Sequence, residues 1–127
     1  MSVRSAKELS VYLKAYELSM LIFDASKQFP AEERFALTGQ IRRSSRSVCI
    51  NLREAWAKRR YAPHFVSKLT DCDGENSETD TSLDFALDCG YINRDLHQDF
   101  AARSMEIGKM LGSMIWRPDP FLLTPDT

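Results

Sequence analysis

The sequence is poor in the residues that build disulfide-rich or metal-binding small proteins. It contains three cysteines, an odd number, and none of them forms a CxxC pair. A disulfide framework or a zinc site needs more cysteines at closer spacing. No apolar run reaches the roughly 20 residues that span a bilayer, and the first residues contain no apolar signal segment. We therefore expect a cytoplasmic protein without a membrane partner.

Catalytic and cofactor-binding motifs are also missing. The sequence has no GxGxxG, P-loop, GxSxG or HExxH pattern. Helical bundles with di-iron sites use Glu-x-x-His pairs, whereas His64 and His97 have no ligand partner one turn away. Cys49 lies among arginines that would lower its thiol pKa, but a structural role is the favoured interpretation. We predict no enzyme, no cofactor and no metal.

What the sequence does contain is apolar residues at three- and four-residue steps, the period of an amphipathic helix. Four such segments occur, from about Ser5 to Lys27, from Pro30 to Pro63, from Pro63 to Gly90, and from Asn93 to Pro118. The inner stripe expected for the first consists of Leu9, Leu13, Tyr16, Met20 and Phe23. That expected for the third consists of Phe65, Leu69, Cys72, Asn76, Thr79, Leu83, Ala86 and Leu87.

Short connections between long helices make neighbouring helices antiparallel. Gly90 suits a left-handed helix end and Asn93 a helix N-cap. The sequence thus predicts an all-α protein, an antiparallel up-down-up-down four-helix bundle over residues 1–117. Residues 118–127 form a C-terminal tail that is either disordered or docked on a bundle.

Two polar residues interrupt the stripe of the third helix. Asn76 and Thr79 occupy positions that should face the core. A buried asparagine in a helical bundle more often fixes register than performs chemistry. We predict a structural polar network of Asn76, Thr79 and Glu75.

Charge is divided sharply along a chain whose net charge is −1. Residues 34–68 contain nine basic residues and one acid, Glu54, whereas residues 71–99 contain nine acids and one base, Arg94. At about 100° per residue, four arginines of the second helix fall within about 40° of one another. This basic ridge consists of Arg42, Arg46, Arg53 and Arg60, and Arg43 lies beside it.

Two interpretations of the basic ridge remain open. In the first, its arginines pair with acids of the third helix, within one subunit or between subunits, and the protein is an interaction scaffold. In the second, they stay exposed and contact phosphates of RNA or DNA. Trp56 is the one aromatic residue near the ridge, so base stacking is weakly indicated.

Several ordered blocks resemble the four-helix bundle proteins encoded in intervening sequences of bacterial 23S ribosomal RNA genes. The similarity runs from about Leu9 to Ile115, and its blocks are residues 29–38, 40–44, 51–54, 75–79, 87–92 and 107–111. The accessory proteins of diversity-generating retroelements look similar as well. The chain departs from the family pattern at Arg53, where a small residue is usual, and at Ala55, where glycine is usual.

The resemblance implies an antiparallel four-helix bundle that assembles as a barrel-shaped homopentamer and has no assigned general function. Likeness to the retroelement accessory proteins implies binding of nucleic acid and of a protein partner through a basic surface. Carried over by position, the motif covers Arg42, Arg43, Arg46 and the block from Asn51 to Glu54.

Overall fold

The computed structural model describes residues 4–124, and within them the chain is all-α, as predicted. Four long helices carry the fold: α1 (Ser10–Ser26), α2 (Leu37–Ala57), α3 (Ala62–Asp88) and α4 (Arg94–Trp116). Three single turns of 3-10 helix lie between or beside them: η1 (Ala6–Glu8), η2 (Ala31–Glu33) and η3 (Asp119–Phe121).

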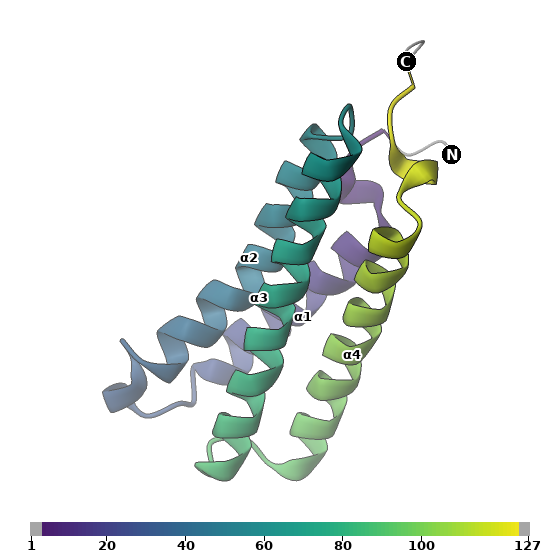
Figure 1. Ribbon diagram of the computed structural model, residues 1–127. Coiled ribbons are helices and arrows are strands. Elements are labelled where there is room, and N and C mark those ends of the chain that lie inside the picture. Colours follow the sequence, from purple (N-terminus) through teal and green to yellow (C-terminus); the bar gives the residue numbers. More distant parts are fainter. Residues whose placement is uncertain (1–3, 125–127) are drawn as a thin grey trace.

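The helices form a four-helix bundle in which consecutive helices alternate in direction (Figure 1). Each helix packs against the next in the chain, and α1 also packs against α4, which closes the bundle. The turn from α2 to α3 lies at one end of the bundle, together with the start of α1 and the end of α4 (Figure 1). The turn from α3 to α4 lies at the other end. The predicted bundle is therefore confirmed.

The inner stripe predicted for α3 is confirmed. Its members from Phe65 to Ala86 are all buried, and they face the stripes of α2 and α4.

The predicted helix ends at Gly90 and Asn93 are confirmed as well. Gly90 has a φ of 79°, and the Tyr91 amide donates to the Ala86 carbonyl, which closes a left-handed helix end. The Asn93 side chain accepts a hydrogen bond from the Leu96 amide at the start of α4.

The start predicted for the second helix is wrong by about seven residues. Pro30 begins only the single turn η2, and α2 starts at Leu37. The Glu33 side chain accepts hydrogen bonds from the Leu37 amide and from the Tyr91 hydroxyl. The break lies at Ala36, whose backbone (φ −122°, ψ −106°) is not helical, and Glu33 supplies an acceptor for the first amide of α2.

The inner stripe predicted for the first helix is wrong at three of its five positions, although Leu9 is buried as predicted. Leu13, Tyr16 and Met20 are each more than half exposed. The buried face instead consists of Val11, Ala15, Leu18, Ser19, Ile22 and Ser26. Two adjacent faces of this helix carry apolar residues, so spacing alone does not choose between them. Packing selects the face with small residues, which lets α1 approach α2 closely.

The described part of the C-terminal tail docks on its own bundle. The Leu123 amide donates to the Arg59 carbonyl in the turn between α2 and α3. The Phe121 ring lies 6.4 Å from the Phe65 ring, centre to centre. The tail therefore crosses the end of the bundle and connects the end of α4 to the α2–α3 turn. Of the predicted tail, residues 125–127 lie outside the described residues.

Candidate nucleic-acid interface

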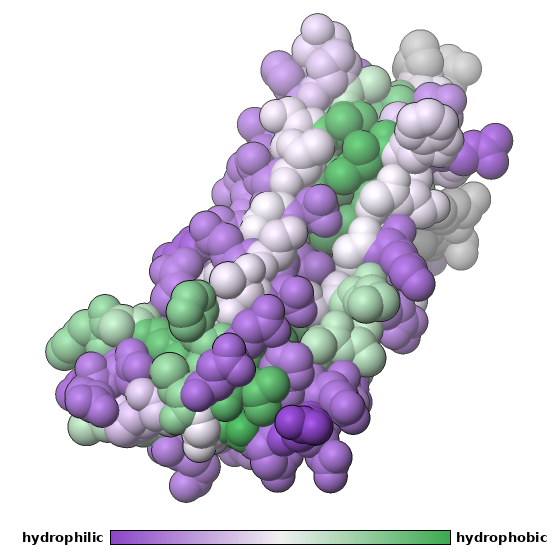
Figure 2. All heavy atoms as spheres, turned by 60° about the horizontal axis from the view of Figure 1, so that its bottom comes forward, coloured by the Kyte–Doolittle hydropathy of each residue, from purple (hydrophilic) through white to green (hydrophobic). Residues whose placement is uncertain are grey.

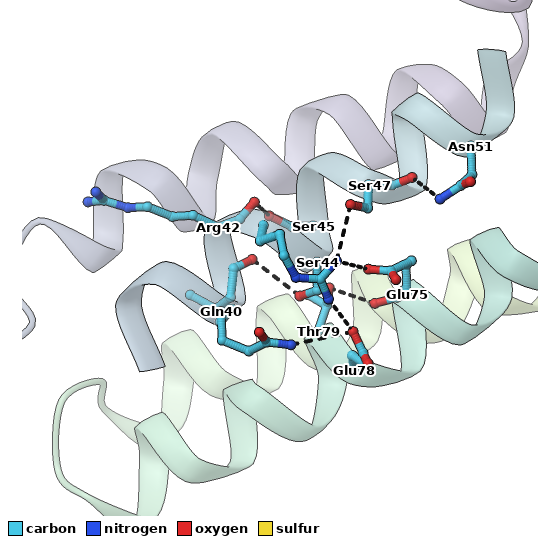
Figure 3. Close-up of polar contacts among 11 residues, drawn as sticks. Gln40, Arg42, Ser44, Ser45, Ser47, Asn51, Glu75, Glu78 and Thr79 are labelled. Atoms are coloured by element: carbon cyan, nitrogen blue, oxygen red, sulfur yellow. Dashed lines mark hydrogen bonds and ion pairs between the residues drawn. The ribbon is translucent and has the colours of Figure 1, made fainter. Parts of the chain in front are cut away.

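The five arginines of the candidate site lie in three different environments. Arg43 points toward α3, where it pairs with Glu78 and Glu75. Its Nη1 atom lies 3.0 Å from Glu75 Oε2, although that pair lacks the angle of a hydrogen bond. Figure 3 shows both glutamates facing α2 from α3. Arg43 therefore makes the contact expected if the basic and acidic helices pair within one subunit.

Arg42 extends away from α3 and attaches α2 to α1 (Figure 3). Its Nε atom donates to Ser26 Oγ at 2.7 Å, and its guanidinium lies 4.7 Å from the centre of the Phe23 ring. Ser26 Oγ in turn donates to the Phe23 carbonyl. This half-buried arginine is occupied by contacts with the end of α1.

Arg46 and Arg53 face a groove between α1 and α2. Within residues 4–124, neither of them forms an ion pair. The α1–α2 groove has a volume of about 540 Å³, and its lining includes Tyr12, Tyr16, Met20 and Ile50. Both arginines are exposed. They are thus available to a partner at an apolar surface.

Arg60 lies beyond the end of α2, so the helical wheel does not predict the direction of its side chain. Lys58, Arg59 and Arg60 form the first three residues of the turn to α3. Lys58 and Arg60 are exposed and have no ion-pair partner in the described part of the chain. Arg59 packs its guanidinium 3.7 Å from the centre of the Trp56 ring and donates from Nε to the Trp56 carbonyl.

The predicted polar residues of α3 make two separate links to neighbouring helices. Asn76 Nδ2 donates to the Ser104 carbonyl at 2.9 Å, and Ser104 Oγ donates back to Asn76 Oδ1 at 3.2 Å. Thr79 Oγ1 shares a 2.8 Å hydrogen bond with Ser44 Oγ on α2 (Figure 3). Asn76 thus reaches α4, while Thr79 and Glu75 reach α2, so the three residues do not form one network.

Gly108 on α4 lies next to this polar link. A Cβ atom at Gly108 would lie 3.4 Å from Asn76 Nδ2, which is an ordinary contact. The link therefore has room for an alanine at this position as well.

Cys49 does not have the environment of a reactive thiol. It is buried beside the α1–α2 groove, and burial raises its thiol pKa to about 11. Burial likewise raises the pKa of Cys72 to about 12. Desolvation is the first cause in both cases, because the thiolate loses its hydrating water on burial.

Residues 4–124 contain neither a metal-ligand cluster nor a membrane-spanning helix. No group of three or more candidate ligands could hold a metal ion in this part of the chain. His97 pairs instead with Asp84, with 2.8 Å between Nε2 and Oδ1. Within the same residues, no helix is long and apolar enough to cross a membrane.

A second exposed apolar surface was not predicted from the sequence. Phe35, which is 92% exposed, and Phe85 line a groove of about 740 Å³ between η2, the start of α2 and the C-terminal half of α3. Apolar side chains gather at this end of the molecule (Figure 2). We call this surface the phenylalanine patch. Glu33 and Glu78 also line it, so its charge is opposite to that of the α1–α2 groove.

Comparison with known proteins gives a family and a solved structure of similar fold. No curated protein matches the chain. A crystal structure of a protein of unknown function from the S23 ribosomal protein family of Bacteroides thetaiotaomicron VPI-5482 matches with a TM-score of 0.74 and 31% identity. That match covers 83% of this chain and 94% of the other. The model of the 23S rRNA-intervening sequence protein family matches residues 7–113. The chain therefore belongs to the 23S rRNA-intervening sequence protein family.

Proposed function

We propose that this chain is a non-enzymatic protein that binds RNA or DNA through phosphate contacts made by Arg46, Arg53 and Arg60. The observation that carries the proposal is that these three exposed arginines have no acidic partner within residues 4–124. Arg42 and Arg43, by contrast, are occupied inside the subunit. A planar guanidinium fits phosphate oxygens in pairs, which makes arginine well suited to this role.

A salt series with mixed-sequence duplex and single-stranded oligonucleotides tests this proposal. Three phosphate contacts on a duplex predict a loss of roughly 40-fold in affinity between about 50 and 200 mM salt, because binding releases counterions. Replacing Arg53 or Arg60 with alanine should lower the slope of log affinity against log salt by about one.

Arg94→Ala is the matched control, because Arg94 is also an exposed arginine without an ion pair among residues 4–124 but lies at the other end of the bundle. It should leave the salt slope unchanged. Affinity that is undetectable at low salt would overturn the proposal, and so would a slope that the Arg53 and Arg60 variants leave intact.

Self-association is a second candidate function, because two exposed apolar surfaces carry opposite charge. We propose a head-to-tail contact in which the phenylalanine patch of one copy meets the α1–α2 groove of the next. Phe35 and Phe85 would enter a groove lined by Tyr16, Met20 and Ile50. A contact between two different surfaces repeats from copy to copy and closes into a ring when the rotation allows. Such a ring is consistent with the pentamer that the family resemblance implies.

Mixing two variants distinguishes this arrangement from a symmetric pair. Met20→Glu blocks the groove, and Phe35→Glu blocks the patch, so each variant alone should be monomeric by light scattering. A mixture should give a dimer, because each variant retains one of the two complementary surfaces. Met105→Glu is the control, since Met105 is exposed on α4 away from both surfaces.

Two results would contradict head-to-tail assembly. One is a wild-type chain that stays monomeric at every concentration tested. The other is a Phe35→Glu variant that keeps the wild-type mass. The assembly would also cover Arg46 and Arg53, which line the groove. Arg60 lies outside the groove lining and would stay available to nucleic acid.

A further inference from the structure

The end of the bundle at the α2–α3 turn gathers basic and aromatic side chains. Lys58, Arg59 and Arg60 follow one another directly, and Tyr61 comes next. Lys58, Arg60 and Tyr61 are exposed, and Tyr61 keeps 55% of its surface accessible. An exposed aromatic ring thus follows two exposed cations at this turn.

The Tyr61 ring is held in place by its neighbour. The His64 ring lies 4.6 Å away, centre to centre, at an interplanar angle of 90°. This is the edge-to-face geometry that aromatic pairs prefer. Tyr61 is therefore an oriented ring at the surface, and ordering it on binding costs little further side-chain entropy.

α4 ends at this end of the bundle (Figure 1), and its last residue, Trp116, is a second exposed aromatic residue. Of the Trp116 surface, 85% is accessible. Arg117 follows it and is exposed as well. The tail then runs from Trp116 to the α2–α3 turn, where the Leu123 amide donates to the Arg59 carbonyl. One anchored segment, residues 117–123, thus connects Trp116 to Arg59, which lies two residues before Tyr61.

Positive charge dominates this surface. Lys58, Arg60 and Arg117 have no ion-pair partner in the part of the chain that the structure describes. Asp119 is an acid on the connecting segment, and Glu54 nearby on α2 is already paired with Lys68 at 2.7 Å. Exposed rings can stack on bases, and the cations beside them can contact the phosphates that join those bases.

We infer that this basic aromatic end is a binding site for single-stranded nucleic acid, with unpaired bases stacked on Tyr61 and Trp116 and phosphates at Lys58, Arg60 and Arg117. The inference rests on the proposed nucleic-acid function and specifies the form of the ligand. In a duplex, the faces of the bases are covered by their neighbours along the strand, so exposed rings gain little from it. A single strand can place its bases on the protein rings.

Two measurements test the inference. The first uses a Trp56→Phe variant, which leaves Trp116 as the sole tryptophan of the chain. A single strand of about 12 nucleotides, within the range of known site sizes, should quench the Trp116 fluorescence, and the matching duplex should quench it much less.

The second measurement uses chains that keep Trp56. Tyr61→Ala and Trp116→Ala should each lower single-strand affinity by roughly 5- to 100-fold, while duplex affinity changes less than twofold. Phe35→Ala is the control, because Phe35 is exposed and lies two residues before α2, whose start is at the opposite end of the bundle (Figure 1). It should change neither affinity. This comparison also stands if the Trp56→Phe variant fails to fold.

The outcomes separate the two proposals. Salt-dependent binding that is equal for single strand and duplex, and unchanged by Tyr61→Ala and Trp116→Ala, would overturn the single-strand site and leave the proposed function standing. No binding of either oligonucleotide at low salt would overturn both. Quenching by single strand together with the loss in both alanine variants would support both.

Discussion

The two sides of α2 are built differently. On the side toward α3, polar groups are paired within the subunit: Arg43 with Glu75 and Glu78, and Ser44 with Thr79 (Figure 3). On the side toward the α1–α2 groove, Arg46 and Arg53 have no ion-pair partner within residues 4–124, and Ile50 is more than half exposed. One helix therefore serves the fold on one side and leaves the other side available to a partner.

The comparison also separates strong from weak contributions to stability. Apolar side chains of α2 that face the core are removed from water completely, and their burial dominates folding. The exposed ion pairs beside them contribute little, because water screens them and two long side chains must be ordered. Substitutions on the two sides of α2 should consequently differ in size and in kind.

Leu52 and Ile50 give the largest expected contrast. Leu52 is 1% exposed and Ile50 is more than half exposed, although they are two residues apart on α2. Leu52→Ala should lower the unfolding free energy by about 2–5 kcal/mol, since it leaves a cavity in the core. Ile50→Ala should change the stability of the monomer by less than about 0.5 kcal/mol.

Urea denaturation of both variants under monomeric conditions measures this contrast. Equal losses in the two variants would mean that the α1–α2 groove is part of the core. In that case the division of α2 into two sides would fail.

Thr79→Val should have an intermediate effect. The substitution keeps the shape of the side chain but removes the hydrogen bond to Ser44 Oγ, whose residue is fully buried. We expect a loss of about 1–3 kcal/mol, because a buried hydroxyl loses a partner. In a Ser44→Ala, Thr79→Val double variant the loss should be less than the sum of the single losses. Additive losses by denaturation would show that the two hydroxyls act independently.

Arg43→Ala should have a small effect on stability. Its ion pairs with Glu75 and Glu78 are partly exposed, so we expect a loss of up to about 1 kcal/mol that decreases as salt is added. Arg46→Ala, the matched substitution on the groove side, removes only the contact of its guanidinium with the Phe23 ring, whose centre is 5.6 Å away, so its loss should be smaller. Thermal unfolding at low and high salt provides the measurement, and a larger loss for Arg46 than for Arg43 would reverse the comparison.

Most of the fold could be predicted from the sequence because three helices each have one apolar stripe. In α3, residues from Phe65 to Ala86 at helical spacing indicate a single buried face, and Gly90 and Asn93 mark the ends that the structure shows. In α1, two adjacent faces are apolar. The choice between them depends on how closely α2 can approach the small residues Ala15 and Ser19. The sequence of α1 alone does not contain that information.

The candidate site was predictable only in part, because it too depends on contacts between helices. The wheel groups Arg42, Arg46 and Arg53 by angle, but it does not show that Ser26 on α1 holds Arg42. Arg60 leaves the helix because α2 ends at Ala57. The aromatic residue at the end of α4, Trp116, is more than 50 residues from the basic turn in sequence. Only the antiparallel arrangement brings the two to one end of the bundle.

Raising the pH should have the smallest effect on the unfolding free energy, because it acts only over the range in which the thiols titrate. Cys49 is buried beside the groove, and burial raises its pKa from 9.0 in an exposed chain to about 11. The folded state favours the neutral thiol, so its stabilising contribution is complete below pH 9 and is lost as the pH rises toward 11. Unfolding free energy should therefore fall over that interval, and a Cys49→Ala variant should lose less of it than the native chain does. Cys89→Ser is the control, because Cys89 is exposed and should give the same pH profile as the native chain. If the Cys49→Ala and native profiles were parallel from pH 8 to 11, Cys49 would be reached by water in solution, and the groove side of α2 would be more open than the packing of α1 implies.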